Sequence, residues 1–234
     1  STSSRLATPS TESEDSGMAT YGTPTKLLSD VSTVVKRKFG DESGVQITDA
    51  DILGWTNDAQ VYLNARSNVL KAKATVSSVA GQAAYSFTSL HIQQIESIHY
   101  AGTRIPNMSF SQAEETVSRY DPNQEVSEDL PVLWYEWAET FTFWPVPSGV
   151  QNIDVYYTKL PTKLVNPTDV LSLPDDFFDD ICNYVLAQAY ELDEDWEAMQ
   201  LKTSQVQQSL DMRGEESRSA QEMTYPVITV IDDF

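Results

Sequence analysis

The stretch from Ile47 to Leu70 constrains the fold more than any other part of the chain, because it has the pattern of one long helix. Thr48 stands at the expected N-cap, and Asp49 and Asp51 place carboxylates in the first turn, where free backbone N–H groups need acceptors. Apolar residues then recur at spacings of three and four, at Ile52, Trp55, Ala59, Tyr62, Leu63, Val69 and Leu70, with Arg66 among them. This spacing predicts an amphipathic helix roughly 35 Å long, whose apolar face needs a packing partner.

The predicted partner lies near the other end of the chain, from Pro174 to Leu210. Four acidic residues suit the positive start of this second long helix: Asp175, Asp176, Asp179 and Asp180. Its apolar stripe includes Phe177, Phe178, Ile181, Tyr184, Val185, Ala189, Leu192, Trp196 and Met199, and Gly214 is expected to end it. A shorter helix is predicted from Pro24 to Phe39.

Between these helices the apolar residues recur at every second position, which is typical of strands. A first hairpin is predicted from Thr75–Val79 and Ala83–Phe87, and a second has its turn near Glu139. In the second hairpin the expected core face is Leu133, Tyr135, Trp137, Phe141 and Phe143. Trp134 and Trp144 are expected on the opposite face, where exposed aromatic side chains favour protein interfaces.

The sequence therefore predicts an α+β fold: an antiparallel long-helix bundle with an inserted antiparallel β-sheet or sandwich domain and extended termini. The predicted segments are a flexible N-terminal arm at 1–22, helical parts at 23–72 and 159–213, a β domain at 73–158 and an extended C-terminal tail at 214–234. The tail contains the β-prone run YPVITVI, which a polar linker separates from the rest of the chain. Such a run is suited to joining the sheet edge of another subunit.

The charge balance bears on which partners the chain can bind. Thirty-five Asp and Glu residues face 15 Lys and Arg, for a net charge of −20. Strong nucleic-acid or anionic-membrane binding needs clustered cations and is not expected. The acidity is explained either by solubility or by a surface that repels DNA or meets a basic partner. A single cysteine rules out a disulfide within the chain, and no apolar run approaches the ~20 residues of a membrane span.

The sequence offers little for catalysis. His91 and His99 lack a local catalytic signature, and Cys182 lies in an apolar helical pattern, as a buried structural thiol would. Glu136 and Glu139 lie among tryptophans and leave a cell-wall polysaccharide hydrolase as an alternative. A sugar-binding module carried by Trp134 and Trp144 is another alternative.

The acidic start of the second long helix has two interpretations. Asp175–Asp180 is interpreted first as helix capping, with a divalent-cation site as the alternative. We expect no enzyme activity, no cofactor and no metal.

Three segments together resemble head-to-tail adaptor (neck or connector) proteins of short-tailed and related bacteriophages. They are ITDADILGWTNDAQ, TFTFWPVPSGVQNIDVYYTKLP and LPDDFFDDICNYVLAQAYELDED, in this order and spacing between Ile47 and Leu210. None is diagnostic alone, since each is a common helix or strand pattern. The long N-terminal arm departs from the compact members of the family, which leaves open which terminus reaches the portal.

The resemblance implies a structural virion protein, located at the neck between capsid portal and tail and made in the host cytoplasm. Such adaptors form a homo-oligomeric ring, usually of twelve copies, beneath the portal protein. They contact a tail, nozzle or next neck protein, and DNA passes through the channel without specific binding during genome ejection. The candidate partner-binding residues are Trp134, Trp144, Tyr225, Val227, Ile228, Val230, Ile231 and Phe234.

Overall fold

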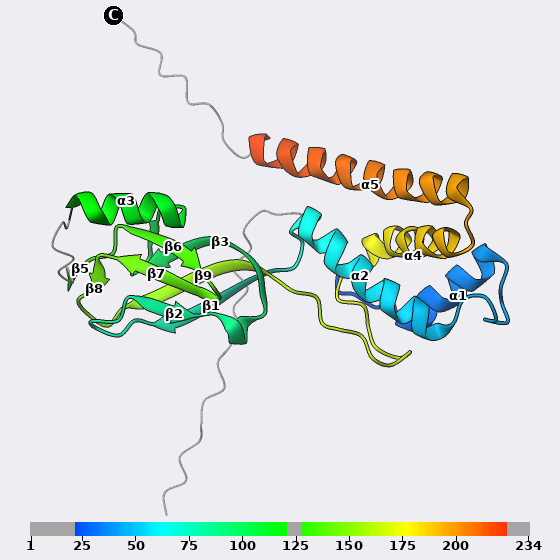
Figure 1. Cartoon of the computed structure of the whole chain (residues 1–234), viewed down its shortest axis with the longest axis horizontal. Coiled ribbons are helices and arrows are strands. Elements are labelled where there is room, and N and C mark those ends of the chain that lie inside the picture. The colour runs from blue at the N-terminus through cyan, green and yellow to red at the C-terminus, as the bar shows by residue number, and fades with distance from the viewer. Residues whose placement is uncertain (1–21, 121–127, 224–234) are drawn as a thin grey trace, which may run out of the picture.

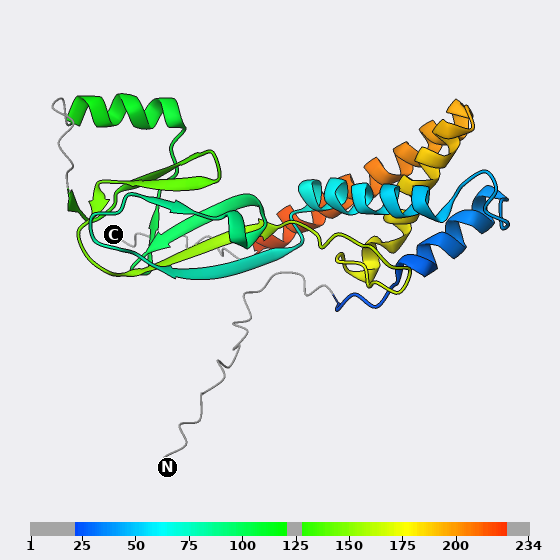
Figure 2. The same cartoon turned by 60° about the horizontal axis from the view of Figure 1, so that its bottom comes forward.

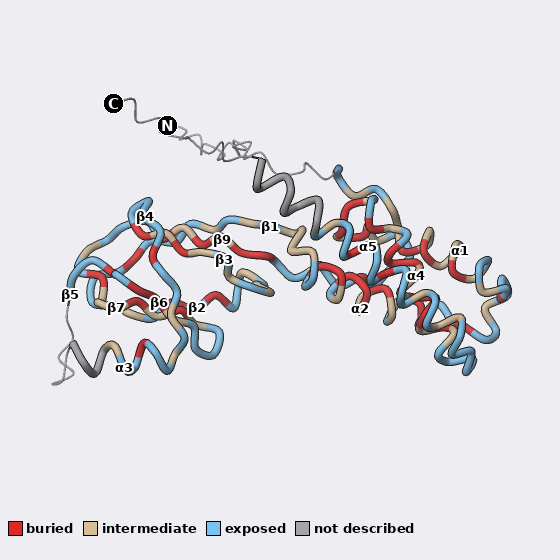
Figure 3. Tube along the Cα trace, turned by 90° about the horizontal axis from the view of Figure 1, so that it is seen from above, coloured by how far each residue is buried: buried red, intermediate tan, exposed pale blue. Residues whose placement is uncertain are grey.

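The computed structural model describes residues 22–120 and 128–223 and arranges them as two bodies joined end to end (Figure 1). Four helices make one body, and strands with one further helix make the other. The turned view in Figure 2 shows the same elongated molecule. Buried residues gather in two cores, one in each body (Figure 3). The mixed α+β class is therefore confirmed, while the predicted N-terminal arm and YPVITVI run lie outside the described residues.

The helices of the first body are α1 (Leu28–Phe39), α2 (Asp49–Ser67), α4 (Phe178–Leu192) and α5 (Trp196–Met223), with a 3₁₀ turn at Asp175–Phe177. Helix α1 begins later than the Pro24 signal predicts, because the residues before it are held extended. The backbone N–H groups of Thr25 and Lys26 donate to Asp175 Oδ1 at 2.8 and 3.1 Å. Leu27 then forms an antiparallel bridge with Val170.

Helix α2 begins as the sequence predicts. The Thr48 N–H donates to Asp51 Oδ2 at 3.0 Å, and the Asp51 N–H donates to Thr48 Oγ1 at 3.2 Å, which completes a capping box. Arg66 also lies as expected, since its guanidinium stands over the Tyr62 ring, 4.3 Å from the ring centroid. The Tyr62 ring in turn packs against Tyr184 of α4, with ring centroids 5.2 Å apart.

The predicted partner of α2 is present, but it is two helices instead of one. Helix α4 packs on both α1 and α2, and the chain then turns at 193–195 so that α5 runs back along α4 (Figure 1). Glu194 takes a left-handed φ of 60°, and the backbone N–H of Asp195 donates to the Tyr190 carbonyl at 2.9 Å. Asp193, Glu194 and Asp195 place negative charge at the negative C-terminal end of α4, which does not favour extending the helix. Helix α5 continues through Gly214 to Met223, so the predicted end at Gly214 is wrong.

Polar side chains on the buried face of α2 fix the segment that leads from the sheet to α4. The Asn64 amide donates to the Lys159 carbonyl at 3.0 Å and accepts from the Leu70 N–H at 3.1 Å. Gln60 Oε1 accepts from the Ser172 N–H at 2.6 Å, and Asn57 Oδ1 accepts from the Leu164 N–H at 2.8 Å. Asn64 is fully buried, so it does not lie on a face free to meet neighbouring copies.

Among the residues that the structure describes, the second body contains nine strands, the 3₁₀ turn Thr88–Leu90 and helix α3 (Phe110–Tyr120). The strands are β1 (Lys71–Ser77), β2 (Ala84–Ser86), β3 (Ile92–Tyr100), β4 (Thr103–Ile105), β5 (Glu128–Asp129), β6 (Leu133–Trp137), β7 (Thr140–Trp144), β8 (Val146–Pro147) and β9 (Asn152–Lys159). Antiparallel sheets of order β1-β9-β3-β4 and β2-β7-β6 share one core, and β5 pairs with β8 in parallel. The predicted first hairpin is wrong, because β1 pairs with β9 and β2 with β7.

The second hairpin is present, but its two faces differ from the prediction. Its turn has only two residues, Ala138 and Glu139, and both have positive φ. This turn pairs Trp137 with Thr140 and Trp134 with Phe143, so odd positions of β6 share a face with even positions of β7. The sequence correctly predicts that side chains alternate between the two faces within each strand. The two-residue turn, however, sets which residues of β6 share a face with which residues of β7, and this differs from the prediction.

Candidate partner-binding surfaces

The side-chain phase of the β6–β7 hairpin decides which tryptophans are exposed. Trp134 is only 3% exposed and shares the core face with Phe141 and Phe143. Its indole N–H donates to the Ile105 carbonyl at 3.1 Å, so both its apolar and polar parts are satisfied internally. The expectation that Trp134 lies on an outer face is therefore wrong. Trp144 lies on the α3 side of the sheet and is half-buried.

Two exposed tryptophans were not among the predicted contact residues. Trp137 is 59% exposed at the end of β6 and stacks on Phe110 of α3, with ring centroids 4.4 Å apart. Trp196 is 55% exposed at the start of α5, next to the exposed Leu192 at the end of α4. Only knowledge of the hairpin phase and of the α4–α5 turn could have identified these positions. The six predicted contact residues from Tyr225 to Phe234 lie outside the described residues.

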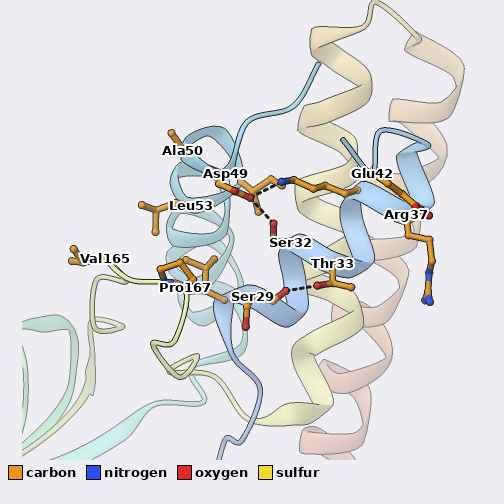
Figure 4. A pocket seen from close by; sticks show the side chains of 13 residues that line it. Ser29, Ser32, Thr33, Arg37, Glu42, Asp49, Ala50, Leu53, Val165 and Pro167 are labelled. Atoms are coloured by element: carbon orange, nitrogen blue, oxygen red, sulfur yellow. Dashed lines mark hydrogen bonds and ion pairs between the residues drawn. The ribbon is translucent and has the colours of Figure 1, made fainter. Parts of the chain in front are cut away.

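A groove of about 700 Å³ opens between α1, the start of α2 and the segment 165–167 (Figure 4). It is lined by Leu28, Ser29, Ser32, Thr33, Lys36, Arg37, Glu42, Asp49, Ala50, Ile52, Leu53, Val165 and Pro167. At its rim Lys36 Nζ and Ser32 Oγ donate to Asp49 Oδ1 at 2.7 and 2.8 Å. These hydrogen bonds, chiefly the one from Lys36, lower the pKa of Asp49. The groove therefore combines apolar walls with a carboxylate already paired, which suits packing better than acid–base chemistry.

The residues considered for catalysis lie on several different elements. Glu136 and Glu139 are both exposed at the β6–β7 turn, and Glu139 accepts a hydrogen bond from Thr88 Oγ1 at 3.1 Å. His91 is exposed after a 3₁₀ turn, and the His99 ring packs on Tyr156 in the four-stranded sheet. Cys182 is fully buried in α4, and burial raises its pKa to about 12, so it remains an unreactive thiol.

The acidic start of the second helical region has structural roles that differ from simple capping. Asp175 accepts hydrogen bonds from Thr25 and Lys26, and those from Thr25 above all lower its pKa. Asp180 is 5% exposed and accepts from Ser209 Oγ at 3.1 Å and Arg213 at 3.2 Å. Across residues 22–120 and 128–223, no group of three or more potential ligands is placed to hold a metal ion. Among the same residues, no helix has the length and apolar character that crossing a membrane requires.

The family profile described as SU10 adaptor protein matches residues 26–229, which include both bodies. No curated protein matches the chain significantly.

Proposed function

Because this chain belongs to the SU10 adaptor protein family, a family of structural phage adaptors, we propose that it forms the ring joining a capsid's portal protein to the tail. The observation that carries the proposal is the extent of the match, which includes the helical body and the β body together. A cell-wall hydrolase or sugar-binding module is not favoured by this membership. Consistent with a structural role, Glu136 and Glu139 are exposed, and Trp134 is unavailable to stack on a sugar.

In this proposal the function depends on assembly. Subunits meet head to tail in a closed ring of about twelve copies beneath the portal, so that each small interface is repeated around the axis. The ring stands at the virion neck after synthesis in the host cytoplasm. It surrounds the passage for DNA during ejection, and the net charge of −20 keeps phosphates from binding to its wall.

The proposed contacts are those of the C-terminal tail with a neighbouring subunit or the portal, and those of the aromatic side of the β body with a neighbouring subunit or a tail part. In the tail they are Tyr225, Val227, Ile228, Val230, Ile231 and Phe234, and in the β body they include Trp144. Trp137 is added to this set because it is 59% exposed, and Trp134 is removed because it is buried.

Deleting residues 223–234 tests the proposal. Both cores are built from residues between Leu28 and Leu210, so the truncated chain should keep its circular-dichroism spectrum and thermal unfolding. It should no longer co-sediment with portal rings, whereas the full chain should. A chain lacking residues 1–21 is the matched control, because it loses the other terminal segment and keeps the tail. Normal assembly of the C-terminally truncated chain on portals would refute the tail's role.

A further inference from the structure

One edge of the four-stranded sheet is open along the whole of β1. The sheet order β1-β9-β3-β4 leaves β1 at the end, and no described strand pairs with its outer side. The strand has seven residues, and five of them are exposed. An open edge of this length is a template for another strand, which soluble proteins normally cover or protect.

The pairing of β1 with β9 shows which backbone groups face outward. At the two ends of the ladder, the Leu70 carbonyl accepts from the Lys159 N–H at 2.9 Å and the Ser78 N–H donates to the Gln151 carbonyl at 2.8 Å. Hydrogen-bonded positions alternate along an antiparallel pair, so even-numbered residues of β1 bond to β9. The backbone N–H and C=O groups of Lys73, Thr75 and Ser77 therefore point away from the sheet.

The side chains of β1 also leave room for a further strand on the core face. That face carries Ala72 and Ala74, which are small and only partly buried, and Val76, which is 38% exposed. A strand added here would cover these residues and extend the core. On the other face, Lys71 and Lys73 are half-exposed and pair with Glu96 and Asp154 at 3.3 and 3.2 Å.

We propose that the segment Tyr225–Ile231 of one copy adds an antiparallel strand to the β1 edge of a neighbouring copy. The inference rests on the proposed function, in which copies stand side by side in a ring. The segment has seven residues, like β1, and is rich in β-branched residues. With Ile228 opposite Ala74, Val230 covers Ala72, and the acidic pair Asp232–Asp233 follows beyond Lys71.

Proline excludes a one-residue shift from this register. With Ile228 opposite Ala74, Pro226 lies opposite Val76, at a position where neither strand's backbone needs a hydrogen bond from the other. Shifting the segment by one residue would instead direct the proline nitrogen, which has no hydrogen, toward β1.

The geometry of α5 favours a neighbouring copy over the same chain. Only Thr224 separates the end of α5 at Met223 from Tyr225, and two residues span at most about 7 Å. Helix α5 packs on α4 and α2 in the helical body, and Figure 1 shows its C-terminal end standing off β1. This placement of α5 favours the β1 edge of a neighbouring copy over the β1 edge of the same chain.

A disulfide trap between two full-length chains tests this proposal. One chain carries Ala74→Cys and the other Ile228→Cys, so that only pairing between copies brings the two thiols together. Directly opposed residues at a non-hydrogen-bonded position have Cα atoms about 4.5 Å apart, within disulfide range. The native Cys182 is buried and does not compete. Mild oxidation of the mixture at high protein concentration should give a cross-linked dimer on a non-reducing gel.

Two variants of the chain that carries Ala74→Cys show whether the backbone of β1 is responsible for the cross-linking. Thr75→Pro removes an outward N–H without touching the backbone hydrogen bonds to β9, and should lower the dimer yield roughly tenfold or more. Thr75→Ala loses the same hydroxyl and its 2.6 Å hydrogen bond to Asp154, but keeps the N–H and should cross-link normally. Pairing Ala74→Cys with Thr229→Cys should fail, because those side chains point to opposite faces.

The proposal is overturned if the mixture gives no dimer, if Thr75→Pro cross-links as well as Thr75→Ala, or if a double-cysteine chain closes its disulfide internally. These results are distinguishable from failure of the proposed function. A chain that assembles on portals without this cross-link would refute only the strand pairing.

Discussion

Arg213 is predicted to hold the C-terminal half of α5 against the start of α4. Its Nη2 atom donates to Asp180 Oδ2 at 3.2 Å and to the Asp176 carbonyl at 2.6 Å. The guanidinium also lies over the Phe177 ring, 4.3 Å from the ring centroid. The Asp180 side chain is only 7% exposed, so replacing Arg213 with methionine leaves a carboxylate in the core without its cation.

The size of the effect follows from this geometry. At 3.2 Å and an effective dielectric constant of about 20, the Coulomb attraction is roughly 5 kcal/mol, before desolvation is subtracted. The Arg213 side chain is 23% exposed, and its Nε is buried with no hydrogen-bond partner among the described residues, so the net effect is smaller. We expect Arg213→Met to lower the free energy of unfolding by about 2–4 kcal/mol at pH 7.

The loss should depend on pH in a defined direction. Burial raises the pKa of Asp180, while Ser209 and Arg213 oppose that rise. When folding raises the pKa of an acid, the contribution of that acid to stability is complete below its unfolded pKa of about 3.9. The contribution is lost as pH rises through the folded pKa. Removing Arg213 raises the folded pKa further, so the deficit of Arg213→Met should be smallest near pH 4 and grow toward pH 7.

Urea unfolding followed by helical circular dichroism measures these free energies. Asp180→Asn is the matched second change, because it removes the charge that Arg213 neutralises. The double variant should recover about 1–3 kcal/mol relative to the sum of the single changes. A loss below about 0.5 kcal/mol for Arg213→Met, the range of an ordinary surface change, would refute this role, as would a loss independent of pH.

Three further predictions concern single residues. Trp134→Ala should cost about 3–5 kcal/mol in thermal unfolding, because it empties the β core, whereas Trp137→Ala should cost about 1 kcal/mol or less. Equal losses would contradict the observed hairpin phase. Asn64→Ala should cost about 2–3 kcal/mol in urea unfolding, because it leaves the Lys159 carbonyl and Leu70 N–H without their partner. Cys182 should not react with a thiol-specific chromophore in native protein but should react fully in denaturant; rapid native reaction would refute its burial.

The elements with strong local signals were predicted correctly. The capping box of Thr48 and Asp51 and the apolar spacing behind it placed the start of α2. The pairing of α2 with the region after Pro174 followed because two long apolar stripes in one chain must cover each other. The capping box and the apolar spacing depend on residues close together along one helix, so the local sequence specifies them.

Other features depend on contacts between distant segments. A buried face containing Thr56, Gln60 and Asn64 does not look apolar. The backbone partners of Asn64 and Gln60 include groups 95 and 112 residues away. The pairing of β1 with β9 likewise joins the two ends of the β body, with no local sequence signal. The phase between β6 and β7 depended on the exact length of one turn, and a one-residue error moved Trp134 from core to surface.

The groove between α1 and α2 was missed for a related reason. Its walls come from three separate segments, and only the fold brings Leu53 and Val165 to the same opening. Each lining residue is ordinary in its own helix or loop. A surface of this kind has no sequence signature, in contrast to a metal or nucleotide site.

Electron microscopy of the full chain bound to portal rings tests the central claim most directly. The structural-adaptor account predicts a closed ring of about twelve copies beneath the portal, with the helical and β bodies resolved in every subunit around an open channel. A single copy, or scattered copies without a closed ring on the portal, would contradict it.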